Sequence, residues 1–396
     1  MVRHLVACWL LFWLAIAGAQ AAHDHGGAMA ARPQLAVTTA FDAQGRLWLA
    51  RVADGHLLIS RSEDRGERFG AAVKVNAVPE PIAADGENRP KLAFGTQGEL
   101  FVSWTRTLED AKYAGHIRFA RSLDDGRTFS TPITVNTDRA PISHRFDSLL
   151  VDGEGRLHLV WLDRRDSAAA RAEQKEFPGI SLYQVVSEDG GASFSPDRKL
   201  VDHSCECCRI AMALDTDGVP VIAWRHVYGA NVRDHAVLRL DGRSQPQRVS
   251  EDDWAIDACP HHGPSLTIDA QGDYHIAWFT GGAARQGLFY ARSDDQGRSF
   301  SAPLGFGDPD RQPAHPAILS HDGTLYLAWK EFDGERSQVR LMHSGDGGKQ
   351  WSPVRTVAAV TGASDHPMLV ANGEAVWLSW NSAQRGAQLL PLESVR

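Results

Sequence analysis

Short runs of alternating hydrophobic and polar residues recur along the chain, and most of them end in tryptophan. In five of these runs a glycine lies six residues before the tryptophan: Gly98/Trp104, Gly155/Trp161, Gly218/Trp224, Gly272/Trp278 and Gly323/Trp329. Gly373/Trp380 has one extra residue, and the segment 45–51 is an earlier copy with Arg51 in the tryptophan position. Alternation bounded by glycine turns predicts half-buried β-strands. The chain is therefore expected to contain seven similar units.

A second repeat, Ser-x-Asp-x-Gly-x-x-aromatic, marks the turns between strands. The pattern suits a tight turn in which the aspartate accepts backbone N–H groups and the glycine takes a positive φ. The aspartates of its copies are Asp64, Asp124, Asp189, Asp295 and Asp346. The interval from Asp189 to Asp295 is about twice the others and fits two units whose shared turn, near Asp241, lacks the motif. Repeats about 50 residues long predict a propeller or a solenoid.

Each unit is expected to contain four strands in a fixed order. A short apolar strand precedes the glycine turn, and the tryptophan strand follows it. A third strand, such as 116–120, then leads through the aspartate turn to a fourth, such as 132–135. Four short antiparallel strands per repeat are typical of a β-propeller blade. We therefore predict an all-β fold, with one propeller domain over 34–396 and seven four-stranded blades; six blades are the alternative.

The aspartate turns resemble the Asp-boxes, or BNR repeats, of the sialidase superfamily, from about residue 34 to the C-terminus. The resemblance implies a sialidase-like β-propeller but no particular activity, since the superfamily includes non-catalytic proteins. Sialidases themselves are similar propellers with six blades. The segments 205–208, Cys-x-Cys-Cys, and 258–260, Ala-Cys-Pro, resemble motifs of an uncharacterised branch of exported bacterial sialidase-like proteins.

Charge and the N-terminal residues narrow the location and the partners. The net charge of −8 gives no basic field that would attract nucleic acid. Arg3, the apolar stretch 5–17 and the small residues at 19–21 form the pattern of a signal peptide. We expect a signal peptide over 1–21, a flexible tail over 22–33, and a periplasmic or secreted protein. No later stretch approaches the ~20 apolar residues needed to span a membrane; the oligomeric state stays open.

Basic side chains recur just before the predicted innermost strands, which would meet at one end of the propeller axis. Arg32 opens this series in the first blade. The candidate ligand-binding residues after it are Arg89, Arg145, Arg209, His262, His315 and His366. Guanidinium groups suit carboxylates, and unpaired buried charge is costly, so we predict a funnel for an anionic small molecule or glycan. Alternatively, each arginine pairs with a local acid, such as Asp85, Glu87, Asp147 or Glu206, and ties blades together.

Whether the chain is an enzyme stays open. Sialidases hold a substrate carboxylate with three arginines and use a tyrosine backed by a glutamate, so the resemblance implies a carboxylated glycan as ligand. Candidates for the catalytic pair are Tyr228 and Glu331, in the loops after the tryptophan strands of blades four and six. The start motif Phe/Tyr-Arg-Ile-Pro is absent from the sequence. Glycan binding is therefore the favoured function, and a glycoside hydrolase of the exo-sialidase type is the alternative.

Four cysteines lie before the innermost strands of blades four and five: Cys205, Cys207, Cys208 and Cys259. The fifth cysteine, Cys8, lies in the predicted signal peptide, so the exported chain would keep an even number. An even number of cysteines in an exported protein predicts two disulfides, and the sequence does not choose their pairing. The alternative is a Cu or Zn site, since thiolates and imidazoles suit these metals. Its ligands would come from Cys205, Cys207, Cys208, Cys259, His261 and His262. The favoured interpretation requires no cofactor.

Overall fold

The structure is a computed structural model that describes residues 34–111 and 113–392. The predicted signal peptide and tail, and Arg32, lie outside the described residues. Nearly all regular structure is β-strand, with α1 (Arg165–Ala172) and the 3₁₀ helix η1 (Pro309–Arg311) as the helices of the described part. Neither is long and apolar enough to cross a membrane. The predicted all-β fold is confirmed.

The strands follow the predicted order, and antiparallel pairing joins each to the next within a unit. The first strands are β1 (Thr38–Phe41), β5 (Lys91–Phe94), β9 (His144–Val151), β13 (Ala211–Leu214), β17 (Ser265–Ile268), β21 (Ala314–His321) and β25 (Met368–Ala371). The second strands, which carry the tryptophans, are β2 (Leu47–Ala53), β6 (Leu100–Thr107), β10 (Leu157–Asp163), β14 (Pro220–Tyr228), β18 (Tyr274–Gly281), β22 (Thr324–Phe332) and β26 (Val376–Ser382).

The outer strands complete propeller-like blades. The third strands are β3 (His56–Ser62), β7 (Gly115–Ser122), β11 (Ile180–Ser187), β15 (Val232–Arg239), β19 (Gln286–Ser293), β23 (Arg336–Ser344) and β27 (Gly386–Leu392). The fourth strands are β4 (Val73–Lys74), β8 (Ile133–Thr134), β12 (Arg198–Ser204), β16 (Gln247–Arg248), β20 (Leu304–Phe306) and β24 (Arg355–Thr361). In the described part the last sheet has three strands, and β9 to β16 form one eight-stranded sheet.

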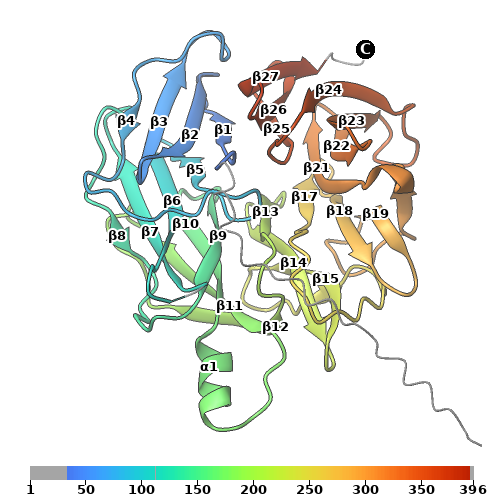
Figure 1. Cartoon of the computed structure of the whole chain (residues 1–396), viewed down its shortest axis with the longest axis horizontal. Coiled ribbons are helices and arrows are strands. Elements are labelled where there is room, and N and C mark those ends of the chain that lie inside the picture. Colours follow the sequence, from blue (N-terminus) through green and yellow to red (C-terminus); the bar gives the residue numbers. More distant parts are fainter. Residues whose placement is uncertain (1–33, 112, 393–396) are drawn as a thin grey trace, which may run out of the picture. The chain divides into compact units, whose positions relative to one another are not determined.

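The first strands of neighbouring units are packed together. Each contacts the first strand before it and the one after it, and β25 contacts β1. Figure 1 shows these strands facing one another around a common centre. The eight-stranded sheet arises where the end of β12 pairs with β14 through Ser204 and His226, so two consecutive units share hydrogen bonds.

The aspartate turns have the predicted geometry. In the copy after β7, Asp124 accepts the Thr128 N–H at 2.9 Å, and the Ser122 hydroxyl accepts the Gly126 N–H at 2.9 Å. Hydrogen bonds from Thr128 and Ser122 lower the pKa of Asp124 to about 2. The motif-free turn between β15 and β16 uses the same device, because Asp241 accepts two backbone N–H groups at 2.8 and 2.9 Å.

Buried tryptophans of the second strands form the core between blades, and most are anchored by an acid. The indole N–H of Trp161 donates to Asp163 at 2.7 Å, and that of Trp329 donates to Glu331 at 2.7 Å. Both rings are fully buried, where an indole N–H without a partner would destabilise the fold. The acid two residues after the tryptophan is therefore part of the core of its blade.

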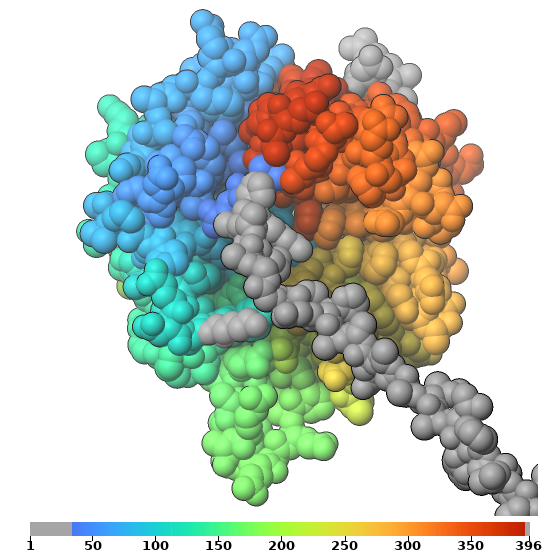
Figure 2. All heavy atoms as spheres, viewed as in Figure 1, coloured from blue at the N-terminus to red at the C-terminus, as the bar shows by residue number. Residues whose placement is uncertain are grey.

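The longest connection between a second and a third strand is the insertion after β10. It contains α1, and Figure 2 shows it projecting beyond the neighbouring strands. A cavity of about 260 Å³ lies between this insertion and the loop that follows β12. Its charged lining residues are Arg164, Arg171, Lys175 and Glu206.

Candidate functional site

A buried carboxylate, Glu87, lies among the segments that start the first strands. Its Oε2 atom accepts the backbone N–H groups of Arg209 at 2.9 Å and of Gly263 at 2.8 Å. Its Oε1 atom accepts a guanidinium N–H of Arg209 at 2.9 Å. Burial opposes ionisation of Glu87, but the charge of Arg209 holds its pKa well below the usual value. One carboxylate thus joins the segments that start β5, β13 and β17.

Three histidines form a stack beside Glu87. The ring centroids are 4.5 Å apart between His262 and His315, and 3.4 Å apart between His315 and His366. The Nδ1 atoms of His315 and His366 are each 3.5 Å from Glu87 Oε1. Burial lowers the pKa of His262 to about 3 and lowers those of the other two. The stack is therefore neutral near pH 7, and it would meet a ligand as polar rings rather than as cations.

Two of the predicted funnel arginines are bound to acids within the protein. Arg89 donates to both carboxylate oxygens of Asp365, at 2.8 and 3.0 Å, and to the carbonyl oxygen of Val37 at 2.6 Å. Arg209 pairs with Glu87 and donates to the carbonyl oxygen of Pro316 at 2.8 Å. These two arginines therefore follow the alternative prediction, in which each arginine pairs with an acid and ties blades together.

Arg145 differs from the other two arginines. It has no ion pair with a described residue, and its half-buried side chain leaves the Nε atom without a hydrogen-bond partner in the described part. The guanidinium carbon is 5.0 Å from the centroid of the Phe146 ring. Burial lowers the pKa of Arg145, although the nearby Asp85 opposes this. Arg145 pairs in register with Leu162, so it lies beside the end of β10 from which the insertion starts.

The candidate catalytic pair is not formed. Glu331 accepts the Trp329 indole N–H and the Asp308 backbone N–H at 3.1 Å, so it belongs to the core of its own blade. Tyr228 lies at the end of β14 with the Arg248 guanidinium over its ring at 4.5 Å. The Tyr228 hydroxyl has no hydrogen-bond partner among the described residues, so no hydrogen bond joins it to Glu331. The spacing of Trp329 and Glu331, which matches that of Trp161 and Asp163, was the sequence pattern that could have revealed the structural role.

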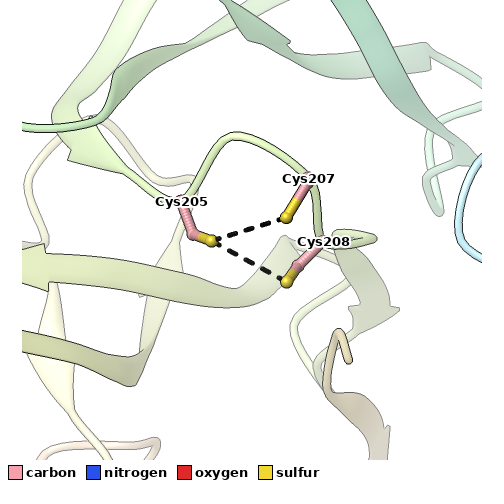
Figure 3. A group of neighbouring side chains, drawn as sticks. All are labelled: Cys205, Cys207 and Cys208. Atoms are coloured by element: carbon pink, nitrogen blue, oxygen red, sulfur yellow. Dashed lines mark hydrogen bonds between the residues drawn. The ribbon is translucent and has the colours of Figure 1, made fainter. Parts of the chain in front are cut away.

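The four cysteines converge, but as free thiols. The Sγ atom of Cys205 lies 4.0 Å from that of Cys207 and 3.8 Å from that of Cys208 (Figure 3). The two sulfur atoms of a disulfide lie about 2.05 Å apart. The two predicted disulfides are therefore not formed in the structure. Cys207 also lies in a second group with Cys259 and His261, whose ligand atoms are all within 4.8 Å of one another. His261, rather than His262, therefore joins the cysteines.

The surroundings lower the pKa of two thiols, Cys205 and Cys259, and raise the pKa of the other two, Cys207 and Cys208. Arg233 donates to Cys205 Sγ at 3.3 Å. Hydrogen bonds from Cys207 and Cys208, with the charges of Arg225 and Arg233, hold the pKa of Cys205 well below its ordinary value. A hydrogen bond from Cys207 lowers the pKa of Cys259 to about 7. A third group with metal-binding potential is Glu87 with His315 and His366.

The four-stranded blades and aspartate turns define a propeller-like protein of the BNR type. The chain belongs to the BNR repeat-like domain family, whose model matches residues 98–377, and the resemblance to the sialidase superfamily is confirmed. No curated protein matches the chain in sequence.

Several solved carbohydrate-active enzymes are similar to the chain in structure. An ulvan lyase of polysaccharide lyase family PL25 has a TM-score of 0.58 at 10% identity, over 90% of this chain and 92% of the lyase. The α-L-arabinanase of Penicillium chrysogenum has a TM-score of 0.50 at 16% identity, over 78% of this chain and 92% of that enzyme. NanB sialidase of Streptococcus pneumoniae has a TM-score of 0.47 at 10% identity, over 88% of this chain and 83% of the sialidase. At such identities the first two similarities show a shared fold alone.

Proposed function

We propose that the chain binds an anionic carbohydrate near Arg145, at the end of the propeller where the first strands begin, and does not hydrolyse it. The observation that carries this proposal is the half-buried Arg145 guanidinium, which has no carboxylate partner among the described residues. A guanidinium in such a position is best stabilised by a ligand with a planar anionic group, since a carboxylate accepts two parallel N–H bonds.

A neighbouring charge supports the same ligand class. Arg171 lines the cavity beside the insertion, which starts from the strand end next to Arg145, whereas Arg164 and Lys175, which also line it, pair with Glu206 and Glu173. An ulvan lyase similar to this chain, with a TM-score of 0.57 at 11% identity, was solved bound to -[GlcA(1-4)Rha3S]-. A chain of uronate units is therefore a reasonable first ligand to test, beside sialylated oligosaccharides.

Binding is favoured over hydrolysis because Glu331, the glutamate of the candidate catalytic pair, already forms hydrogen bonds within its own blade. Glu331 is nearly fully buried, and its contacts with Trp329 and Asp308 serve the core of its blade. The three-arginine clamp of sialidases would also need Arg89 and Arg209, and both have acidic partners. One free guanidinium suits recognition of a carboxylate better than it suits a complete hydrolase site.

We infer further that the fold is a closed propeller of seven blades and that the protein is exported. The cycle of contacts through the seven first strands supports the blade count over six. The basic, apolar and small residues of the segment 1–21 support export to the periplasm or beyond. The N-terminal residue of the mature protein would test the second inference.

Calorimetric titration with uronate and sialylated oligosaccharides, against neutral oligosaccharides of equal length, tests the binding proposal. Arg145→Ala should weaken binding of the anionic series by about 10- to 100-fold, as expected for loss of a charged hydrogen bond. Arg51→Ala, which removes the same charge from an exposed position, is the matched control and should bind as the wild type does. Equal binding by Arg145→Ala and the wild type, or no preference for anionic oligosaccharides, would overturn the proposal. Release of a free sugar from any ligand would overturn the binding-only part.

A further inference from the structure

The cysteines and His261 form two overlapping groups of three ligands each. Cys205, Cys207 and Cys208 make the inner group, and all three are buried. Cys207, Cys259 and His261 make the outer group, in which Cys259 and His261 are exposed. Cys207 belongs to both groups. Thiolates and an imidazole in such a set are ligands for soft and borderline metal ions.

The separations of the inner thiols match those of sulfur atoms around one metal ion. Sulfurs bound at ~2.3 Å lie about 3.8 Å apart in a tetrahedral site and about 4.0 Å apart in a trigonal one. The inner Sγ atoms lie 3.8 and 4.0 Å apart in the two pairs that involve Cys205. A disulfide would require either pair to approach to ~2.05 Å. The loop thus holds the thiols at a spacing that suits a shared ion and not a covalent bond.

The surroundings of the inner group suit a cluster with negative charge. Three thiolates and one monovalent cation carry a net charge of −2, because three negative charges meet one positive charge. Arg233 donates directly to Cys205, and the Arg225 charge acts on the same thiol. Phe146, Ile180 and Ile210 belong to the same core cluster as these thiols and supply an apolar side to the group. Two arginines in an apolar shell would balance the charge and exclude water, the role of outer partners at metal sites.

The number of ligands distinguishes between metals. Structural zinc sites are almost always four-coordinate, whereas within the described residues the four thiols do not form one group within 4.8 Å. Together with His261, they form two groups of three ligands that share the Cys207 sulfur. Thiolates suit Cu(I), and a trigonal site needs three ligands, which is the number that each group supplies.

We propose that Cys205, Cys207, Cys208, Cys259 and His261 bind two Cu(I) ions, with the Cys207 sulfur bridging the inner and the outer ion. An incoming Cu(I) ion first binds the exposed Cys259 and His261. The inner ion, which the buried thiols bind, is held more tightly than the outer one. Binding releases the thiol protons to water and involves no change of oxidation state. This site is separate from the proposed carbohydrate site in its ligand and in its test.

Titration of the reduced full chain with Cu(I) under anaerobic conditions, in competition with a colorimetric Cu(I) chelator, tests this proposal. The wild type should take up two equivalents and develop the ultraviolet absorption of Cu(I) thiolates. Cys207→Ser should weaken the binding of both Cu(I) equivalents by about 100-fold or more, because it removes the ligand that the two ions share. Cys259→Ser alters an exposed residue that is not part of the core, and it should retain one tight equivalent.

His321→Gln is the control, since it removes an imidazole from β21 that belongs to neither group of ligands. It should bind two equivalents as the wild type does. Circular dichroism of each variant separates loss of ligand from loss of fold. Two equivalents in Cys259→Ser would overturn the two-ion arrangement. Tighter binding of one Zn(II) by all four thiols would overturn the choice of metal. Two disulfides and no free thiols in the protein isolated from cells would overturn the site itself.

Discussion

Replacement of Glu87 by glutamine tests whether this one carboxylate ties together the segments around it. Its oxygens accept three hydrogen bonds, two from the backbone N–H groups of Arg209 and Gly263 and one from the Arg209 side chain. Glutamine has nearly the same size but has one accepting oxygen. Its NH₂ group would face either the two backbone donors or the Arg209 guanidinium, and neither can accept a hydrogen bond.

The expected cost follows from the burial of the pair. Glu87 is 3% exposed, and the substitution leaves the Arg209 charge without its acid and at least one buried N–H without an acceptor. Loss of one partner of a buried ion pair costs about 3–5 kcal/mol. We therefore expect Glu87→Gln to lower the free energy of unfolding by about that amount. Glu87→Gln combined with Arg209→Met should cost less than the sum of the two single changes, since no unpaired charge remains.

Urea denaturation followed by tryptophan fluorescence and circular dichroism gives these free energies. Glu63→Gln is the matched control, because Glu63 pairs with Arg61 at the surface with 62% of its side chain exposed. An exposed pair contributes about 0–1 kcal/mol, so this variant should remain close to the wild type. If Glu87→Gln is no less stable than Glu63→Gln, the carboxylate does not have the structural role that its hydrogen bonds indicate.

Two further predictions concern the histidine stack and one aspartate turn. Burial lowers the pKa of His262 to about 3, so this ring stays neutral in the fold while the unfolded chain binds a proton below pH ~6.5. The contribution of this neutral ring to stability is present in full above that pH and is lost as the pH falls toward 3, at about 1.4 kcal/mol per pH unit. In His262→Gln the free energy of unfolding should therefore depend on pH less steeply, by that slope. An unchanged slope would refute the lowered pKa of His262. Gly126→Ala should destabilise more than Gly98→Ala by thermal denaturation: both glycines have positive φ, but only at Gly126 would the new Cβ lie 2.5 Å from the Trp48 ring. An equal loss of thermal stability in the two variants would show that the close approach to the Trp48 ring does not add to the cost of replacing Gly126.

The sequence could predict the blades because their determinants are local. The serine, aspartate and glycine of each turn lie within five residues of one another, as Ser122, Asp124 and Gly126 do, and they form their hydrogen bonds without help from the rest of the chain. The tryptophan strands likewise carry their alternation within a short segment. Local patterns of this kind are read from one window of sequence, so the order of strands and the motif-free turn near Asp241 were both predictable.

The partners of the polar side chains could not be predicted in the same way. Arg89 pairs with Asp365, which is 276 positions away, and Arg209 pairs with Glu87, which is 122 positions away. These residues lie in irregular segments whose paths depend on how neighbouring blades pack, and no periodicity records which acid reaches which guanidinium. The sequence therefore predicted a funnel of positive charge, whereas the fold neutralises two of its three described arginines.

The cysteine loop, the insertion after β10 and Arg145 lie beside one junction between two units. The end of β12 pairs with β14 there, and the Cys205 N–H donates to the Arg225 carbonyl oxygen at 2.9 Å, so the cysteine loop is anchored in two units at once. Glu206, between the cysteines, pairs with Arg164 at the start of the insertion at 2.6 Å. Arg145 lies next to the strand that leads into that insertion and is close enough to Cys207 for their charges to interact. A loop held by two sheets is a rigid support for closely spaced ligands, which is why the chemistry of this protein is expected at this junction rather than at the neutralised centre.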